Sequence, residues 1–154
     1  MDFLAIDVET ANADYSSICQ IGIAEFRNGH IIDKWSTLIN PEAYFDQFNS
    51  SIHGIEEEDV VDALTFDQIY NELSERITGK IVVHHMPFDR IAISRACVEY
   101  NLDLLQPRWL DSAKIVRRTW EQFAYKGYGL AKITKFLEIE FAVSGKLQCT
   151  KIGK

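Results

Sequence analysis

An Asn28-Gly29 pair separates two apolar strand-like runs near the start of the chain, and no other local feature constrains the fold as strongly. Asn-Gly is the strongest short-range signal for a type I′ hairpin turn, because both residues tolerate a positive φ angle. The pair therefore predicts a hairpin between strands over residues 18–26 and 30–39. With a further apolar run over residues 3–6, it predicts an antiparallel meander of strands.

The rest of the chain alternates one more strand with helices. A loop-rich stretch is expected over residues 42–64, and a helix begins at Thr65, because Thr65 and Gln68 have capping-box spacing. A meander followed by alternating helices and strands favours an α/β fold with a mixed sheet flanked by helices. The remaining elements are expected at residues 81–83 (a buried strand), 88–100, 110–120 and 129–137 (helices).

Length and composition are those of one soluble globular domain. The chain has 154 residues, of which 47% are hydrophobic and 25% charged, and these values exclude disordered and fibrous classes. No segment approaches the roughly 20 apolar residues of a membrane helix, and no basic patch precedes an apolar stretch at the amino terminus. We therefore expect a cytoplasmic protein.

The cysteines and the net charge indicate the cellular compartment and the kind of ligand. Cys19, Cys97 and Cys149 are odd in number and lack metal-ligand spacing, which indicates a reducing compartment, with Cys19 and Cys97 as small core residues. Lys and Arg total 16 against 23 Asp and Glu, a net charge of -7. A protein that binds a duplex by neutralising phosphates is normally basic. This chain therefore needs metal ions to meet a polyanion, or binds no nucleic acid.

Three acidic residues are candidate metal ligands. Asp7 and Glu9 end an apolar strand pattern, and the period of two puts both carboxylates on one face, roughly 7 Å apart. Asp89 falls in the first turn of a predicted helix, where a negative charge suits the helix dipole. The three carboxylates are expected to meet at one edge of the sheet and to share divalent cations.

Several motifs in a fixed order resemble a known family. Asp-x-Glu on the first strand, ICQIGIAEF, the HGI segment and HHMPFD are similar to the DnaQ-like exonucleases of the ribonuclease H-like fold, which are named for their DEDD acids, and to their DEDDh branch. The similarity covers about residues 2–141. It implies a single exonuclease domain over residues 1–154, with a mixed five-stranded sheet, similar to the proofreading subunit of a bacterial replicative DNA polymerase.

The resemblance also implies an activity and a site. It makes Asp7, Glu9 and Asp89 the catalytic ligands of two Mg²⁺ or Mn²⁺ ions, in a 3′-to-5′ exonuclease that releases nucleoside 5′-monophosphates from a nucleic-acid 3′ end. Stacking on apolar or aromatic side chains would accept any base. The residues expected beside the terminal nucleotide are Thr10, Ala11, His53, Ile55 and Phe88.

The carboxyl-terminal segment departs from the family pattern. Phe141 leads into AVSGKLQCTKIGK, which contains neither the general-base His nor the fourth metal-binding Asp of the branch. The family's last helix reads as truncated or replaced, and Glu138 and Glu140 are not assigned as the missing acid. We therefore hypothesise a weak or inactive nuclease. The alternative is a catalytically silent module that holds nucleic-acid ends or a partner protein. An uncovered sheet face would also favour a homodimer.

Other polar residues have a structural and a functional interpretation. Adjacent His84 and His85 point to opposite faces of a strand, which favours packing over a zinc site. Asp111 is interpreted as a helix cap rather than a ligand, and the acidic run over residues 56–59 as a solvated helix amino terminus. Contact with a phosphate backbone and a plain solvent-facing surface both remain open for Lys114, Arg117 and Arg118.

Overall fold

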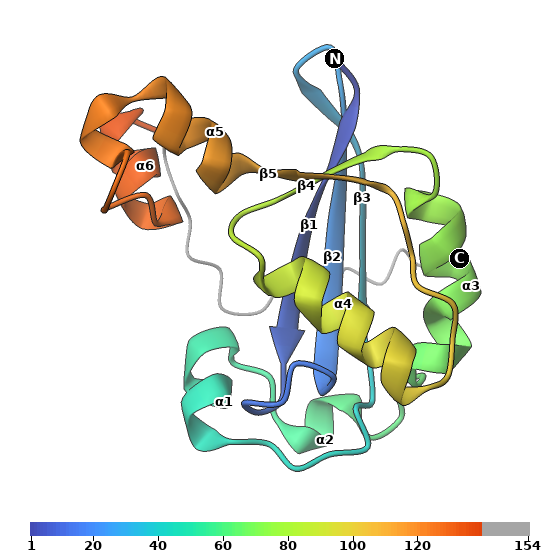
Figure 1. The fold of residues 1–154 in the computed structure, drawn as a ribbon. Coiled ribbons are helices and arrows are strands. Elements are labelled where there is room, and N and C mark those ends of the chain that lie inside the picture. Colours follow the sequence, from blue (N-terminus) through green and yellow to red (C-terminus); the bar gives the residue numbers. More distant parts are fainter. Residues whose placement is uncertain (140–154) are drawn as a thin grey trace.

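The structure, a computed structural model, describes residues 1–139 of the chain. The hypotheses about Cys149, Glu140 and the segment after Phe141 concern residues outside this part. Within residues 1–139, five strands form one mixed sheet in the order β3-β2-β1-β4-β5 (Figure 1). The predicted α/β class with a mixed five-stranded sheet is confirmed.

The amino-terminal meander consists of β1 (Phe3–Thr10), β2 (Ile18–Arg27) and β3 (His30–Leu38), and both neighbouring pairs are antiparallel. Asn28 and Gly29 connect β2 to β3 with φ angles of 49° and 82°, as a type I′ turn requires. The predicted hairpin is therefore confirmed.

Two short parallel strands complete the sheet. β4 (Ile81–His84) pairs with β1, and β5 (Arg108–Asp111) pairs with β4. The prediction of a helix from residue 110 was wrong at its start, because Leu110 lies opposite Val83 in the sheet and α5 (Ser112–Thr119) begins only after Asp111. β5 was missed because Arg108 and Asp111 are charged and it has no continuous apolar run like that of β4.

The helices follow the remaining predictions, with one correction. Thr65 caps α3 (Phe66–Ile77), and its N–H donates to Gln68 Oε1 at 2.9 Å, so the predicted capping box is confirmed. The loop-rich stretch predicted over residues 42–64 contains two short helices, of which the first was not predicted and the second confirms the acidic helix amino terminus. These and the other helices are α1 (Gln47–His53), α2 (Glu57–Val60), α4 (Phe88–Glu99), the 3₁₀ helix η1 (Glu121–Phe123) and α6 (Leu130–Phe136).

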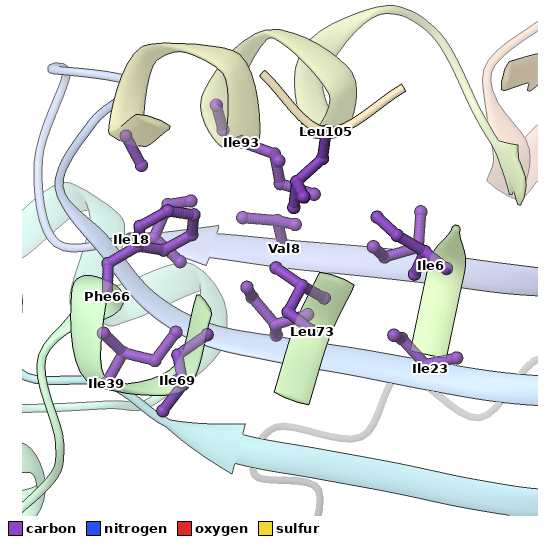
Figure 2. Close-up of a cluster of buried hydrophobic side chains, with 14 of the residues drawn as sticks. Ile6, Val8, Ile18, Ile23, Ile39, Phe66, Ile69, Leu73, Ile93 and Leu105 are labelled. Atoms are coloured by element: carbon purple, nitrogen blue, oxygen red, sulfur yellow. The ribbon is translucent and has the colours of Figure 1, made fainter. Parts of the chain in front are cut away.

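The main core lies between one face of the sheet and the helices α3 and α4 (Figure 2). Alternate residues of β1 point into it, while the residues between them face the other side. The helices contribute a stripe at helical spacing, because residues three or four apart share one face. The buried members labelled in Figure 2 are Ile6, Val8, Ile18, Ile23, Ile39, Phe66, Ile69, Leu73, Ile93 and Leu105.

The structure gives the positions of two cysteines and the lengths of the helices. Cys19 and Cys97 are both 0% exposed and free of disulfides, which confirms them as core residues. Among the helices of residues 1–139, none combines the length and apolar character needed to cross a membrane.

We predict that Leu73→Ala lowers the free energy of unfolding by about 2–5 kcal/mol, because Leu73 is fully buried between α3 and the sheet and truncation leaves a cavity. Urea unfolding followed by circular dichroism measures the change. Asn71→Ala, at an exposed position of the same helix, is the control and should change stability by less than about 0.5 kcal/mol. Equal effects of the two substitutions would contradict the packing described for α3.

Candidate active site

Asp7 and Glu9 lie on the face of β1 that points away from the main core. Leu4, Ile6 and Val8 are buried on the opposite face, whereas Asp7 is exposed and Glu9 half-buried. Gly22 of β2 lies directly opposite Asp7. Because glycine has no side chain, the surface beside the Asp7 carboxylate stays open.

Asp89 reaches the same place from the first turn of α4. β4 ends at His84, and the chain turns through Met86, which has a positive φ of 67°, before α4 begins at Phe88. The Asp89 side chain is buried, and its Oδ1 accepts a hydrogen bond from the N–H of Val8 at 3.0 Å. Val8 lies between Asp7 and Glu9, so this bond brings the third carboxylate to the other two.

The electrostatics of the site reflect this crowding. Burial, followed by the charges of Asp7 and Asp89, raises the pKa of Glu9 to about 7. Burial and the Asp7 charge raise the pKa of Asp89 to about 7, although backbone N–H groups that donate to its carboxylate oppose the rise. Desolvation raises the pKa of Asp7 as well, although the residue as a whole is exposed. Keeping all three carboxylates ionised so close together therefore costs free energy.

A hard divalent cation fits the chemistry of this donor set. All three groups offer oxygen only, as Mg²⁺ and Mn²⁺ prefer, and no ion pair within residues 1–139 neutralises any of them. In the same residues, no three His, Cys, Asp or Glu side chains already surround one point at which they could hold a metal ion. The three residues are brought together, and their role as metal ligands stays a prediction.

Thr10 and His53 join the end of β1 to α1. The carbonyl of Thr10 lies 3.1 Å from both Asn49 Nδ2 and His53 Nε2. His53 Nδ1 accepts the N–H of Ile55 at 3.0 Å, so we assign the ring proton to Nε2, which donates to Thr10. Burial lowers the pKa of His53. The ring is therefore neutral near pH 7 and serves as a link between backbone groups.

Ala11 and Ile55 are core residues in this structure. Their side chains are 0% and 2% exposed and pack with Cys19 and Val60 in a second, smaller cluster beneath α1 and α2. The structure therefore favours their structural interpretation, and their expected contact with a nucleotide stays a prediction.

Phe88 lies at the rim of the site in an aromatic pair. It is half-buried, and its ring contacts that of Tyr15 edge to face at 5.4 Å between centroids. Tyr15 is 44% exposed and comes from the β1–β2 loop. Sequence reasoning missed Tyr15, which lies in a loop, and Asn49, which lies in the short helix α1 that the sequence pattern did not predict.

The histidine pair at the end of β4 contacts neighbouring protein groups. His84 is buried, with Nδ1 hydrogen-bonded to the carbonyl of Met86, and its ring meets Trp109 edge to face. His85 lies on the opposite side, where its nitrogens contact Ser112 Oγ at 2.9 Å and the Tyr128 carbonyl at 2.8 Å. Asp111 caps α5 by accepting the N–H of Ala113 at 2.9 Å, as predicted.

Comparisons with known proteins agree with this geometry. Residues 4–143 match the protein-family model described as exonuclease. The 3′-5′ exonuclease DinG of Staphylococcus epidermidis is 28% identical over 118 residues, which are 75% of this chain and 13% of the relative. The PolC-type DNA polymerase III of Caldanaerobacter subterraneus subsp. tengcongensis is 25% identical over 142 residues, which are 90% of this chain and 10% of the relative.

A solved structure shares the fold. Exonuclease X, in complex with 5′ overhanging duplex DNA, superimposes with a TM-score of 0.72 at 21% identity, over 90% of this chain and 75% of that one. The mixed sheet and its helices thus have the ribonuclease H-like arrangement. The chain spans only about a tenth of the length of the two curated relatives.

We predict that Asp89→Asn stabilises the metal-free protein by about 1–3 kcal/mol at pH 8, because the amide oxygen still accepts the Val8 N–H while a disfavoured buried charge is lost. A carboxyl group with a raised pKa binds its proton more tightly in the folded state, so stability falls as pH rises through about 4 to 7. The advantage of Asp89→Asn should therefore shrink as the pH is lowered from 8 to 5.

Thermal unfolding in chelator at several pH values measures this difference. Asp62→Asn is the matched control. Asp62 is exposed and follows α2 in the sequence, so its substitution should give no such pH dependence. An Asp89→Asn protein that is less stable than the wild type at pH 8 would show that the buried carboxylate charge does not destabilise the folded protein.

Proposed function

The chain belongs to the exonuclease family, and from this premise we propose that it is a metal-dependent 3′-to-5′ exonuclease. The proposed reaction hydrolyses the last phosphodiester bond at a nucleic-acid 3′ end and releases a nucleoside 5′-monophosphate. One observation carries the proposal: the hydrogen bond from Val8 to Asp89, which puts the third carboxylate beside Asp7 and Glu9. We propose the single-stranded end of DNA or RNA as the substrate.

Asp7, Glu9 and Asp89 would hold two Mg²⁺ or Mn²⁺ ions. When bound, such ions neutralise charge on the phosphate and lower the pKa of water. The protein supplies rigid positions for the carboxylates, because Asp7 and Glu9 are part of a paired strand and Asp89 is fixed by a backbone N–H. Their mutual repulsion, expressed in the raised pKa values of Glu9 and Asp89, favours cation binding.

The aromatic pair at the rim suits a terminal base. Phe88 follows directly on the turn that leads to Asp89, and Tyr15 offers a partly exposed ring beside it. Stacking on such rings is typically worth about 1–3 kcal/mol per base and tolerates any sequence. We therefore propose contacts from Phe88 and Tyr15 to the last base, while Thr10, Ala11, His53 and Ile55 shape the floor beneath the terminal nucleotide.

A second function is favoured by one sequence observation. Residues 141–154 contain neither His nor Asp, and positioned acid–base assistance is typically worth about 10²- to 10⁴-fold in rate. A slow nuclease is therefore expected. The second candidate is a silent module that binds nucleic-acid ends or a partner without cleaving. A single domain over residues 1–154, a cytoplasmic location and a homodimer remain parts of the proposal.

The deciding experiment digests a 5′-labelled single-stranded oligonucleotide with Mn²⁺ or Mg²⁺ present. We expect a slow ladder of products that shorten from the 3′ end, abolished by chelator. Asp7→Asn and Asp89→Asn should each reduce the rate by at least about 100-fold, a loss of about 2.7 kcal/mol in transition-state stabilisation. Each removes one carboxylate charge while keeping nearly the same side-chain shape.

Asp62→Asn is the control and should retain the wild-type rate, because Asp62 is an exposed residue outside the site. Calorimetric uptake of Mn²⁺ that Asp7→Ala abolishes, without any cleavage, would favour the silent module. Activity that survives both site substitutions would remove Asp7 and Asp89 from the mechanism.

A further inference from the structure

A hollow surface is formed by residues of β4, β5, α4 and α5. A pocket of about 560 Å³ opens between the end of β4, β5 and α5, on the side of the sheet where α5 leaves β5 (Figure 1). Four cationic residues line it: Arg90, Lys114, Arg117 and Arg118. An adjoining hollow of about 330 Å³ shares Lys114, Arg117 and Arg118.

The local charge of this surface is opposite to that of the whole chain. The chain carries a net charge of -7, but Asp111 is the one carboxylate among the residues that line the larger pocket. Oδ1 of Asp111 accepts the N–H groups of Met86, at 3.1 Å, and Ala113, at 2.9 Å. Because four cationic side chains face this one carboxylate, the surface attracts anions.

Of the four cationic side chains, one makes contacts within the protein and three are exposed to solvent. Arg117 donates from Nε to the carbonyl of Ala124 at 3.0 Å, and its guanidinium lies 4.9 Å from the centre of the Tyr128 ring. Arg90, Lys114 and Arg118 are exposed, and within residues 1–139 they form neither an ion pair nor a side-chain hydrogen bond. Lys114 and Arg118 are one helical turn apart, on the same face of α5.

The pocket is close to Asp89 along the chain. Met86 and Pro87 form part of its wall, and Asp89 follows two residues later. Consecutive Cα atoms are about 3.8 Å apart, so the Cα atoms of Met86 and Asp89 are within about 11 Å. Met86 donates its N–H to Asp111, the cap of α5, at 3.1 Å, so the chain between the pocket and Asp89 also contacts the start of α5.

Aromatic rings accompany the cations. Trp109 and Tyr128 line the pocket and are half-buried, so each presents part of its ring. Alternation of cations with flat rings is typical of surfaces that bind single strands, where phosphates meet the charges and bases stack on the rings. An acidic protein segment would use the charges but would have no need of the rings.

From these observations we infer that the α5 surface, defined as Arg90, Lys114 and Arg118 with Trp109 and Tyr128, binds the sugar–phosphate backbone of the strand upstream of the 3′ end. This inference rests on the proposed function for the position of that end. Through this surface, a protein of net negative charge would bind a polyanion.

The test measures binding of a 5′-fluorescent single strand of about ten nucleotides in chelator, so that no hydrolysis is needed. Lys114→Ala/Arg118→Ala should weaken binding by at least about tenfold at low salt. Each phosphate contact contributes about 0.7 to the slope of log affinity against log salt, so loss of two contacts should lower that slope by about 1.4. The double variant should keep the wild-type melting temperature, because both side chains are exposed.

Arg27→Ala/Lys34→Ala is the matched control. It removes one arginine and one lysine from β2 and β3, and β3 is the sheet edge opposite β5. This control should bind the strand within about twofold of the wild type. Equal weakening by both double variants would overturn the inference, since overall charge alone would then explain binding.

Two further outcomes are decisive. A polyglutamate peptide of matched charge that displaces the strand at equal concentration would overturn the assignment to nucleic acid. A strand that binds through Lys114 and Arg118 but is never shortened after Mn²⁺ is added would remove the proposed nuclease function and leave this inference standing.

Discussion

The arrangement of the site depends on how the sheet ends beside β1. The parallel strand β4 pairs with β1 only at Leu4 and Ala5, so the N–H of Val8 has no strand partner on that side. Asp89 supplies the missing acceptor at 3.0 Å, and a buried N–H without an acceptor would cost about 1–3 kcal/mol. The same carboxylate thereby comes to lie beside Asp7 and Glu9. One hydrogen bond thus completes the backbone pairing and assembles the acidic cluster.

Sequence reasoning succeeded where a local physical rule determines the structure. The Asn28-Gly29 turn, the Thr65 capping box and the Asp111 cap each depend on residues a few positions apart, and all three are present. β5 was missed because a four-residue strand next to a helix is defined by its pairing with β4 and not by its own pattern. For the site, period two placed Asp7 and Glu9 together, and a first-turn position on the helix after a buried strand indicated Asp89. Tyr15 was missed because it comes from a loop without any periodic signal.

The molecule separates its charges in a way that serves a polyanionic ligand. The carboxylates on β1 and α4 repel a phosphate unless cations intervene, whereas the exposed Arg90, Lys114 and Arg118 attract it directly. Under the proposed function, this separation would let a protein of net negative charge bind a strand at one place and cleave it only where metal ions are bound. Surface attraction of this kind weakens with salt, because exposed charges are screened over about 8–10 Å, while a chelated cation is less affected.

The link at Thr10 has a consequence for acid conditions. Both ring nitrogens of His53 are occupied, one giving its proton to the Thr10 carbonyl and the other receiving the amide of Ile55. A second proton on the ring would turn the acceptor nitrogen into a donor that faces the Ile55 N–H, and the two would repel. Protonation would therefore break the bond between the His53 ring and the loop after α1, while the ring would still donate to the Thr10 carbonyl at the end of β1.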